Sequence, residues 1–220
     1  MNMRRNFGQS LVALTLILTG CGGTSQLSSQ TDIPTPERTY ADLKGRKCAV
    51  MVFADWRTRT EYNQIQIDTA RLLTGKLEQR LKAAKDEKKS DSGVTTEFLN
   101  PASVVRYQRE HPEVAGLPIV EVAPRLGGIS RLVYVEFEDF AAQSPEAIMI
   151  LKGEAKATLR IIEVENGKAK IAFEEAGIIA HFPPDAPEGV VPSDKFNVRT
   201  IYEGTLDRLT DILAVRFNEQ

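Results

Sequence analysis

The stretch that most constrains the fold is a pair of alternating segments joined by Asn166-Gly167. Apolar and polar side chains alternate from residue 155 to residue 161, and a second run follows over residues 168–174. Asn-Gly between two such runs is the strongest short-range signal for a β-hairpin with a two-residue turn. One face of this hairpin is apolar, so helices elsewhere in the chain must cover it.

The other predicted elements alternate between strands and helices. The apolar run Cys48–Phe53 predicts a strand covered on both faces, and residues 94–99 and 132–138 predict two more. Helices are predicted over residues 70–84, 101–110, 118–126 and 202–217, from apolar spacings of three and four or from the capping pair Asn100-Pro101. This order predicts an α/β or α+β sandwich with a mixed β-sheet of about five strands covered by helices.

The amino terminus is typical of a secretory signal peptide. Arg4 and Arg5 precede the apolar run Leu11–Leu18, and small residues follow it. This run is shorter than the roughly 20 apolar residues that span a bilayer. Residues 22–39 are rich in Ser, Thr, Gln, Gly and Pro, which predicts a flexible tether. A single folded domain is predicted over residues 40–220.

The end of the signal resembles the lipobox of bacterial lipoproteins. Its residues are Leu18-Thr19-Gly20-Cys21. In that class the chain is cut before the cysteine, whose thiol is lipidated, so the resemblance implies a signal peptide over residues 1–20 and membrane attachment through lipid on Cys21. Gly22, in place of Asp, resembles the pattern of lipoproteins sorted to the periplasmic face of the outer membrane. The alternatives are a plain signal peptide or a buried helix that ends in Cys.

Several classes of chemistry find no support in the sequence. The formal net charge of -2 argues against nucleic-acid binding and against a polybasic membrane patch. With Cys21 lipidated, Cys48 is left without a disulfide partner and is predicted to be a buried small hydrophobe. His111 and His181 have no Cys or second His at ligand spacing, which argues against zinc and against a His-based triad. We therefore expect no catalytic residue, metal or cofactor, and a protein that is not an enzyme.

One cluster has the composition of a binding surface. Trp56, Arg57, Arg59 and Tyr62 follow the first predicted strand, where α/β sheets tend to place ligands, and Asp55–Thr60 is predicted to be a polar loop. Trp, Tyr and Arg are favoured at binding hot spots, so these four are our candidate partner-binding residues. The simpler alternative is that Trp56 caps the core while both arginines are solvated.

A second candidate is a pair of carboxylates. Alternation puts Glu136 and Glu138 on one strand face, which suggests acid–base chemistry, but a solvent-facing strand explains them more simply.

Three segments in this order resemble a known group of periplasmic domains. Val50 and Phe53 match a V-x-x-F strand pattern, Ala123, Leu126 and Gly127 match A-x-x-L-G, and the Asn166-Gly167 hairpin follows. The domain is similar to that of the curli-secretion lipoproteins (CsgG), the amino-terminal domain of TolB and the lipoprotein activators of peptidoglycan synthases. The resemblance implies a TolB-like sandwich and a role as envelope scaffold, secretion part or regulator.

Pore-forming members of this group carry long amphipathic segments. A membrane-spanning strand needs about 9–11 residues. Here the link from Phe140 to Leu151 is short and contains Ser144-Pro145-Glu146, which disfavours a channel.

Three functions follow as expectations. The first is a non-enzymatic cell-envelope lipoprotein that binds a protein partner in an outer-membrane assembly, in secretion or in cell-wall machinery. The second, from another class, is a lipid-tethered enzyme or small-ligand binder that uses residues 55–62. The third is a homo-oligomeric secretion component, which requires a self-association that the sequence neither shows nor excludes.

Overall fold

The computed structural model describes residues 33, 35–36, 38–88, 95–143 and 149–217, without the side chains of residues 85–88. The predicted signal peptide, the predicted lipidation site Cys21 and most of the predicted tether therefore lie outside the described residues. The described strands are β1 (Lys47–Phe53), β2 (Glu97–Phe98), β3 (Arg131–Ala141), β4 (Gly153–Glu165) and β5 (Lys168–Phe182). The helices are α1 (Trp56–Glu61), α2 (Ile65–Lys88), α3 (Pro101–Glu110), η1 (Pro112–Gly116), α4 (Ile119–Val122), η2 (Ala123–Leu126) and α5 (Val198–Ala214), of which η1 and η2 are 3₁₀ helices.

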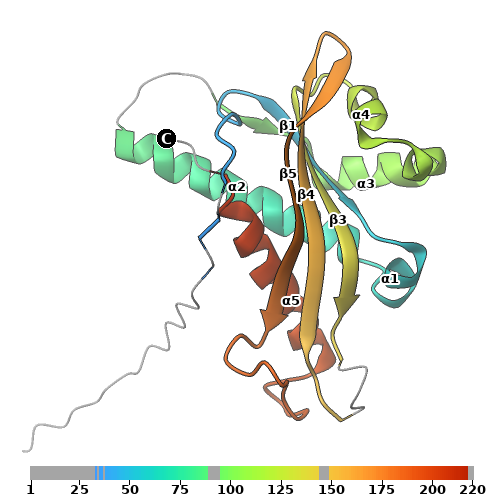
Figure 1. Cartoon of the computed structure of the whole chain (residues 1–220), viewed down its shortest axis with the longest axis vertical. Coiled ribbons are helices and arrows are strands. Elements are labelled where there is room, and N and C mark those ends of the chain that lie inside the picture. The colour runs from blue at the N-terminus through green and yellow to red at the C-terminus, as the bar shows by residue number, and fades with distance from the viewer. Residues whose placement is uncertain (1–32, 34, 37, 89–94, 144–148, 218–220) are drawn as a thin grey trace, which may run out of the picture. The chain divides into compact units, whose positions relative to one another are not determined.

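The strands form one mixed sheet in the order β2-β1-β3-β4-β5 (Figure 1). β1 pairs in parallel with both β2 and β3, whereas β3, β4 and β5 pair antiparallel. The predicted mixed five-stranded sheet with helices is thus confirmed, in the α+β class. The loop and the helix that follow β1 lie at the carboxyl end of this parallel part of the sheet.

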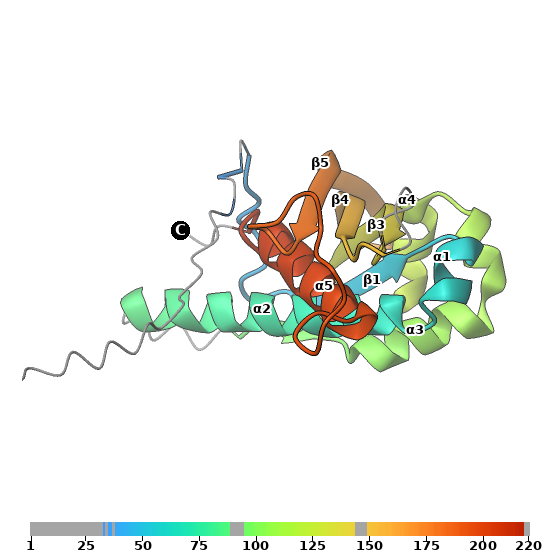
Figure 2. The ribbon, with the colours of Figure 1, turned by 90° about the horizontal axis from the view of Figure 1, so that it is seen from below.

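Helices cover the two faces of the sheet unequally (Figure 2). α2 and α5 pack on one face, where Leu73, Leu77, Leu206 and Leu209 meet the buried side chains of β1, β3, β4 and β5. On the other face, α3, η1, α4 and η2 cover β1 and the neighbouring parts of β3 and β4. Among the described residues, no helix has both the length and the apolar composition to cross a membrane.

The predicted hairpin is confirmed as β4 and β5. Asn166 and Gly167 both have positive φ angles, 52° and 74°, and Glu165 faces Lys168 across the turn. Ala155, Ala157, Leu159 and Ile161 point into the core, as their alternation predicts. β5 runs on to Phe182, well beyond the predicted end, with two shifts in register against β4.

The prediction of a polar loop over Asp55–Thr60 is wrong. The segment forms helix α1, because the Asp55 carboxylate accepts a hydrogen bond from the Thr58 backbone N–H at 2.8 Å and caps the first turn. None of the α1 side chains is buried, so the sequence of this helix has no apolar stripe from which it could be predicted. The strand predicted over residues 94–99 is also shorter in the described part, where β2 has two residues.

Residues near the start of the folded domain contact residues at its carboxyl end. The Tyr40 backbone N–H donates to the Arg216 carbonyl at 2.7 Å, and the Tyr40 and Phe217 rings meet edge to face at 6.4 Å. Asp42 forms an ion pair with Arg131, the first residue of β3. These contacts, which we call the arm latch, lie beside the amino ends of β1 and β3.

Candidate functional site

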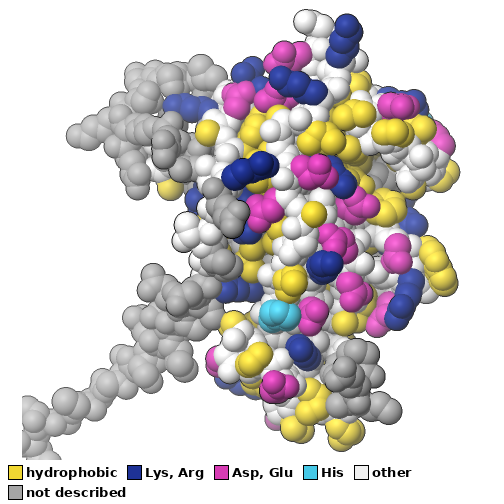
Figure 3. Space-filling view, viewed as in Figure 1, with side chains coloured by type: hydrophobic (Ala, Val, Ile, Leu, Met, Phe, Trp, Pro, Cys, Tyr) yellow, Lys and Arg dark blue, Asp and Glu magenta, His cyan; other side chains and the backbone are white. Residues whose placement is uncertain are grey.

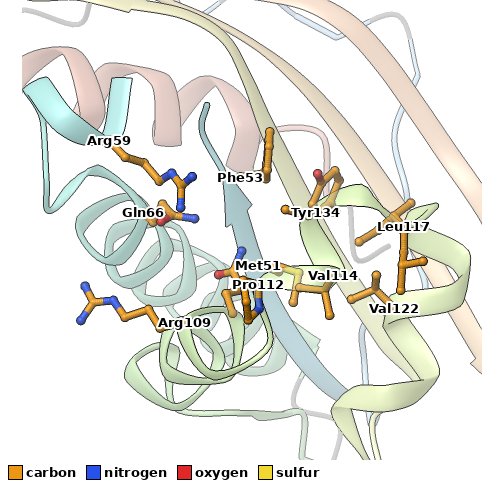
Figure 4. A pocket seen from close by; sticks show the side chains of 13 residues that line it. Met51, Phe53, Arg59, Gln66, Arg109, Pro112, Val114, Leu117, Val122 and Tyr134 are labelled. Carbon is orange, nitrogen blue, oxygen red and sulfur yellow. The ribbon is translucent and has the colours of Figure 1, made fainter. Parts of the chain in front are cut away.

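A cavity of about 320 Å³ lies beside the carboxyl half of β1, under α3, η1 and α4 (Figure 4). Thirteen side chains line it, and they come from segments far apart in the sequence: Met51, Phe53, Arg59, Gln66, Gln108, Arg109, Pro112, Val114, Ala115, Leu117, Ile119, Val122 and Tyr134. The volume falls at the small end of the range of about 300–1,000 Å³ in which ligand pockets lie.

Apolar side chains form the floor of this cavity. Met51 of β1, Val114 of η1 and Val122 of α4 are buried, and they belong to the smaller core cluster on this face of the sheet. Burial raises the pKa of Tyr134, and nearby Glu136 adds to this effect, so its phenol is neutral at physiological pH. The floor therefore offers an apolar ligand surface without a charge.

Two glutamines are fixed at one wall by a shared acceptor. The Val52 carbonyl accepts hydrogen bonds from Gln66 Nε2 at 2.8 Å and from Gln108 Nε2 at 3.0 Å. This arrangement sets the orientation of both amides. The Oε1 atom of Gln108 is buried, and no described residue donates a hydrogen bond to it. A buried acceptor without a donor is uncommon in proteins, and ligand or water sites are one reason for it.

Two arginines give the cavity a positive rim. In Figure 4 the guanidinium of Arg59 points over the cavity toward Gln66, whereas that of Arg109 is turned outward at the edge. Arg59 Nε donates to the Asp55 carbonyl at a long 3.4 Å. Among the residues that the structure describes, neither guanidinium forms an ion pair with a carboxylate. The rim thus carries positive charge, which the Asp55 carboxylate at the start of the same helix partly offsets at Arg59.

The structure places the four predicted partner-binding residues in different surroundings. Of the four, only Arg59 lines the cavity, while Arg57 and Tyr62 line a separate polar hollow beside Glu138 and Asp139. Trp56 is 72% exposed, so the alternative in which it caps the core is wrong.

The side chain of Tyr62 contacts other residues of the fold. Its ring stacks on Tyr202 at 5.7 Å, and its hydroxyl accepts a hydrogen bond from the Ala142 N–H at 3.1 Å. Burial raises the pKa of Tyr62 to about 12. These contacts fix the position of Tyr62 in the packing between α2, α5 and the end of β3.

The paired carboxylates on β3 have cationic partners of their own. Glu136 binds Arg160 at 2.5 Å and Glu138 binds Lys156 at 2.8 Å, both across to β4. Figure 3 shows acidic and basic side chains interspersed on the side that it presents. Cross-strand ion pairs on an open sheet face explain these residues without acid–base chemistry. Cys48 is fully buried, as predicted.

Sequence reasoning found one cavity residue, Arg59, and missed Gln66, Gln108 and Arg109. The missed residues lie on helices that are predicted from an apolar stripe or from a capping pair. Polar side chains outside such a stripe are normally exposed to solvent, so the sequence pattern does not single these out. Only the packing of α2 and α3 against the end of β1 brings them together. Within the described residues, no group of three His, Cys, Asp or Glu side chains converges as a metal site would require. The arrangement can bind an anionic group carried on an apolar body.

No protein family and no curated protein matches this sequence. Solved structures with a related chain path include the lipoprotein GNA1162 from Neisseria meningitidis, at 10% identity and a TM-score of 0.37, over 76% of this chain and 99% of that one. They also include a PelC dodecamer from Paraburkholderia phytofirmans, at 9% identity and a TM-score of 0.36, over 86% and 96%. The hypothetical protein CT253 from Chlamydia trachomatis, at 14% identity and a TM-score of 0.32, covers 73% and 97%. Similarity at this level leaves the function of the chain open.

Proposed function

We propose that this chain is a non-enzymatic cell-envelope lipoprotein that binds a protein partner at the cavity beside the carboxyl end of β1. The observation that carries the proposal is a cavity with an apolar floor, whose two rim arginines have no ion-pair partner among the described residues. Unpaired charged side chains beside such a floor favour a partner of opposite charge, because complementary charges speed its approach and fix its orientation.

The sequence supports the envelope location. The lipobox-like Leu18–Cys21 supports a lipid anchor on Cys21, and Gly22 supports the periplasmic face of the outer membrane. The segment pattern that resembles curli-secretion, TolB and peptidoglycan-synthase activator domains supports an accessory role in an outer-membrane assembly, in secretion or in cell-wall synthesis.

Photo-crosslinking in the native cell tests this proposal. A benzoylphenylalanine that replaces Trp56 in the full lipidated chain stands on α1, close to the rim residue Arg59. We expect it to form one discrete adduct with an envelope protein. The same probe at Val191, which is 66% exposed but does not line the cavity, is the matched control and should not form that adduct.

A second substitution shows whether the adduct depends on the cavity. Arg59→Met in the probe-bearing chain should abolish the adduct, and Arg57→Met, on the same helix but outside the cavity, should not. An adduct that is indifferent to Arg59, or that forms at Val191 and not at residue 56, contradicts the proposal.

A further inference from the structure

We propose that the cavity binds the carboxy-terminal residue of a polypeptide whose last side chain is apolar. The terminal carboxylate pairs with Arg59, the N–H of the terminal residue donates to Gln108 Oε1, and the side chain packs on the floor formed by Met51, Val114 and Val122. This inference rests on the proposed function, because it names the partner chemistry of the same site.

The anionic group of the ligand is inferred from the two arginines at the cavity rim. Arg59 points over the cavity, and Arg109 stands at its edge (Figure 4). Two neighbouring carboxylates already have contacts of their own: Asp55 caps α1 and also attracts Arg59, and Glu113 contacts His111 Nδ1 at 3.1 Å. A guanidinium presents a planar fork of donors that matches a carboxylate. An incoming carboxylate therefore meets two guanidinium groups that form no ion pair with any described residue.

The N–H group of the ligand is inferred from the two glutamines at the cavity wall. The shared Val52 carbonyl holds the amide groups of Gln66 and Gln108 with both Nε2 atoms turned toward β1. Gln108 Oε1 is left buried and without a donor. Because this atom has almost no accessible surface, a ligand N–H reaches it only when the Gln108 side chain shifts toward the cavity. The shift is favoured because a buried acceptor left unpaired is unfavourable.

The three features together separate a peptide end from other carboxylates. A fatty acid supplies the carboxylate and the apolar body but has no N–H for Gln108. A free amino acid supplies all three, but its ammonium group would lie close to two guanidinium groups, which repel it. An acylated terminal residue supplies a neutral N–H. Recognition of a terminal carboxylate is also a recurring mode of peptide binding.

Calorimetric titration of the full lipidated chain in detergent micelles tests the ligand chemistry. The probe is N-acetyl-alanyl-leucine, for which we expect a Kd of roughly 0.1–1 mM, as ligand efficiencies allow for so small a molecule. Its carboxamide lacks the negative charge, and its N-methylleucine analogue lacks the N–H, so each should bind about tenfold more weakly or worse. Free leucine and octanoate should bind no better than these analogues.

Variants of one helix test the assignment of Arg59. Arg59→Met should weaken binding of N-acetyl-alanyl-leucine by about tenfold and remove the preference over the carboxamide. Arg59→Lys, which keeps the charge but not the fork, should restore part of it. Arg57→Met is the matched control and should leave the affinity unchanged, because Arg57 does not line the cavity.

Each other outcome overturns the inference. Octanoate that binds as tightly as the dipeptide assigns the cavity to acyl chains, and free leucine that binds as tightly assigns it to amino acids. Absence of dipeptide binding, together with a photo-adduct at residue 56 that still depends on Arg59, rejects the peptide-end ligand and leaves the proposed function standing. Absence of both rejects the two proposals together.

Discussion

At the scale of single residues, burial determines how much an ion pair contributes to the free energy of unfolding. Arg131 is 1% exposed, and its guanidinium binds Asp42 and donates to the Ser130 carbonyl at 2.7 Å, with Glu163 at 3.7 Å. Arg199 forms an ion pair of good geometry with Glu203 at 2.7 Å, but its side chain is 85% exposed. Water screens the second pair more strongly than the first, in which the guanidinium is buried although the Asp42 side chain is 45% exposed.

We therefore expect Arg131→Met to lower the free energy of unfolding by about 2 kcal/mol, because it removes the bonds of a buried guanidinium to Asp42 and to the Ser130 carbonyl. Asp42 keeps its ion pair with Arg46 and Glu163 keeps its ion pair with Lys170, which limits the loss. The matched change Arg199→Met should alter stability by no more than about 0.5 kcal/mol. Urea denaturation of the full chain measures both. Equal effects for the two variants contradict the view that the arm latch is anchored by Arg131.

Glu138 links stability to acid pH. Hydrogen bonds from Lys156, Thr158 and the Gly177 N–H lower the pKa of Glu138 from 4.5 to about 2. A carboxyl group with a depressed pKa stabilises the fold above its unfolded pKa, and this stabilisation is lost as the pH falls from about 4.5 toward 2. The side chain is 30% exposed, so solvent limits the effect to about 1 kcal/mol.

Glu138→Gln should accordingly cost about 1 kcal/mol at pH 7 and flatten the dependence of unfolding free energy on pH between about pH 5 and pH 2. Chemical denaturation of the variant and the wild type at several pH values measures the two slopes. A variant whose stability falls with acid as steeply as that of the wild type shows that Glu138 does not titrate in this range.

At the scale of the elements, two glycines in helices show the difference between backbone cost and packing need. A Cβ atom at Gly204 of α5 would lie 2.5 Å from the Phe182 ring at the end of β5, whereas nothing lies within 4 Å of one at Gly75 of α2. Glycine in a helix interior costs about 1 kcal/mol relative to alanine in either case. Only at Gly204 does the close approach of helix and sheet require it.

Gly75→Ala should thus raise the free energy of unfolding by about 0.5–1 kcal/mol. Gly204→Ala should lower it by about 1–3 kcal/mol, because the clash with Phe182 outweighs the gain in helix propensity. The two melting curves, recorded on the same preparation, give opposite signs. Stabilisation by both changes means that α5 can move off the sheet without loss.

The elements also show which parts of the fold the sequence predicts. Helix α3 begins and ends as predicted, because Asn100 caps it, Pro101 starts it and Pro112 follows it. The β4–β5 turn is set by two residues that tolerate positive φ. α1 escaped prediction because its one signal is the Asp55 cap. The cavity escaped it because Gln108 and Arg109 acquire their role only when α3 packs against β1, a contact between segments about 55 residues apart.

At the scale of the whole molecule, the arm latch and the cavity lie toward opposite ends of β1. The latch joins Tyr40 to Arg216 and Phe217, and Asp42 to Arg131 at the amino end of β3. The cavity lies beside Met51 and Phe53 of β1. The seven residues of β1 span about 23 Å. No side chain lines both places, so the chain's attachment at the latch leaves the cavity walls unaffected.

This separation predicts that membrane anchoring and ligand binding are independent. Cys21→Ser removes the predicted lipidation site and should release the protein from the membrane fraction, because a lipid anchor would then be absent and the described residues contain no helix able to span a bilayer. The released chain should unfold at the same urea concentration as the lipidated one and bind N-acetyl-alanyl-leucine with an affinity within about twofold, since the cavity is built from residues 51–134. Cys48→Ala is the matched control: it removes the buried thiol of β1 and should leave the protein in the membrane fraction. Retention of Cys21→Ser in carbonate-washed membranes contradicts the assignment of Cys21, and release accompanied by loss of dipeptide binding contradicts the independence of the two ends of β1.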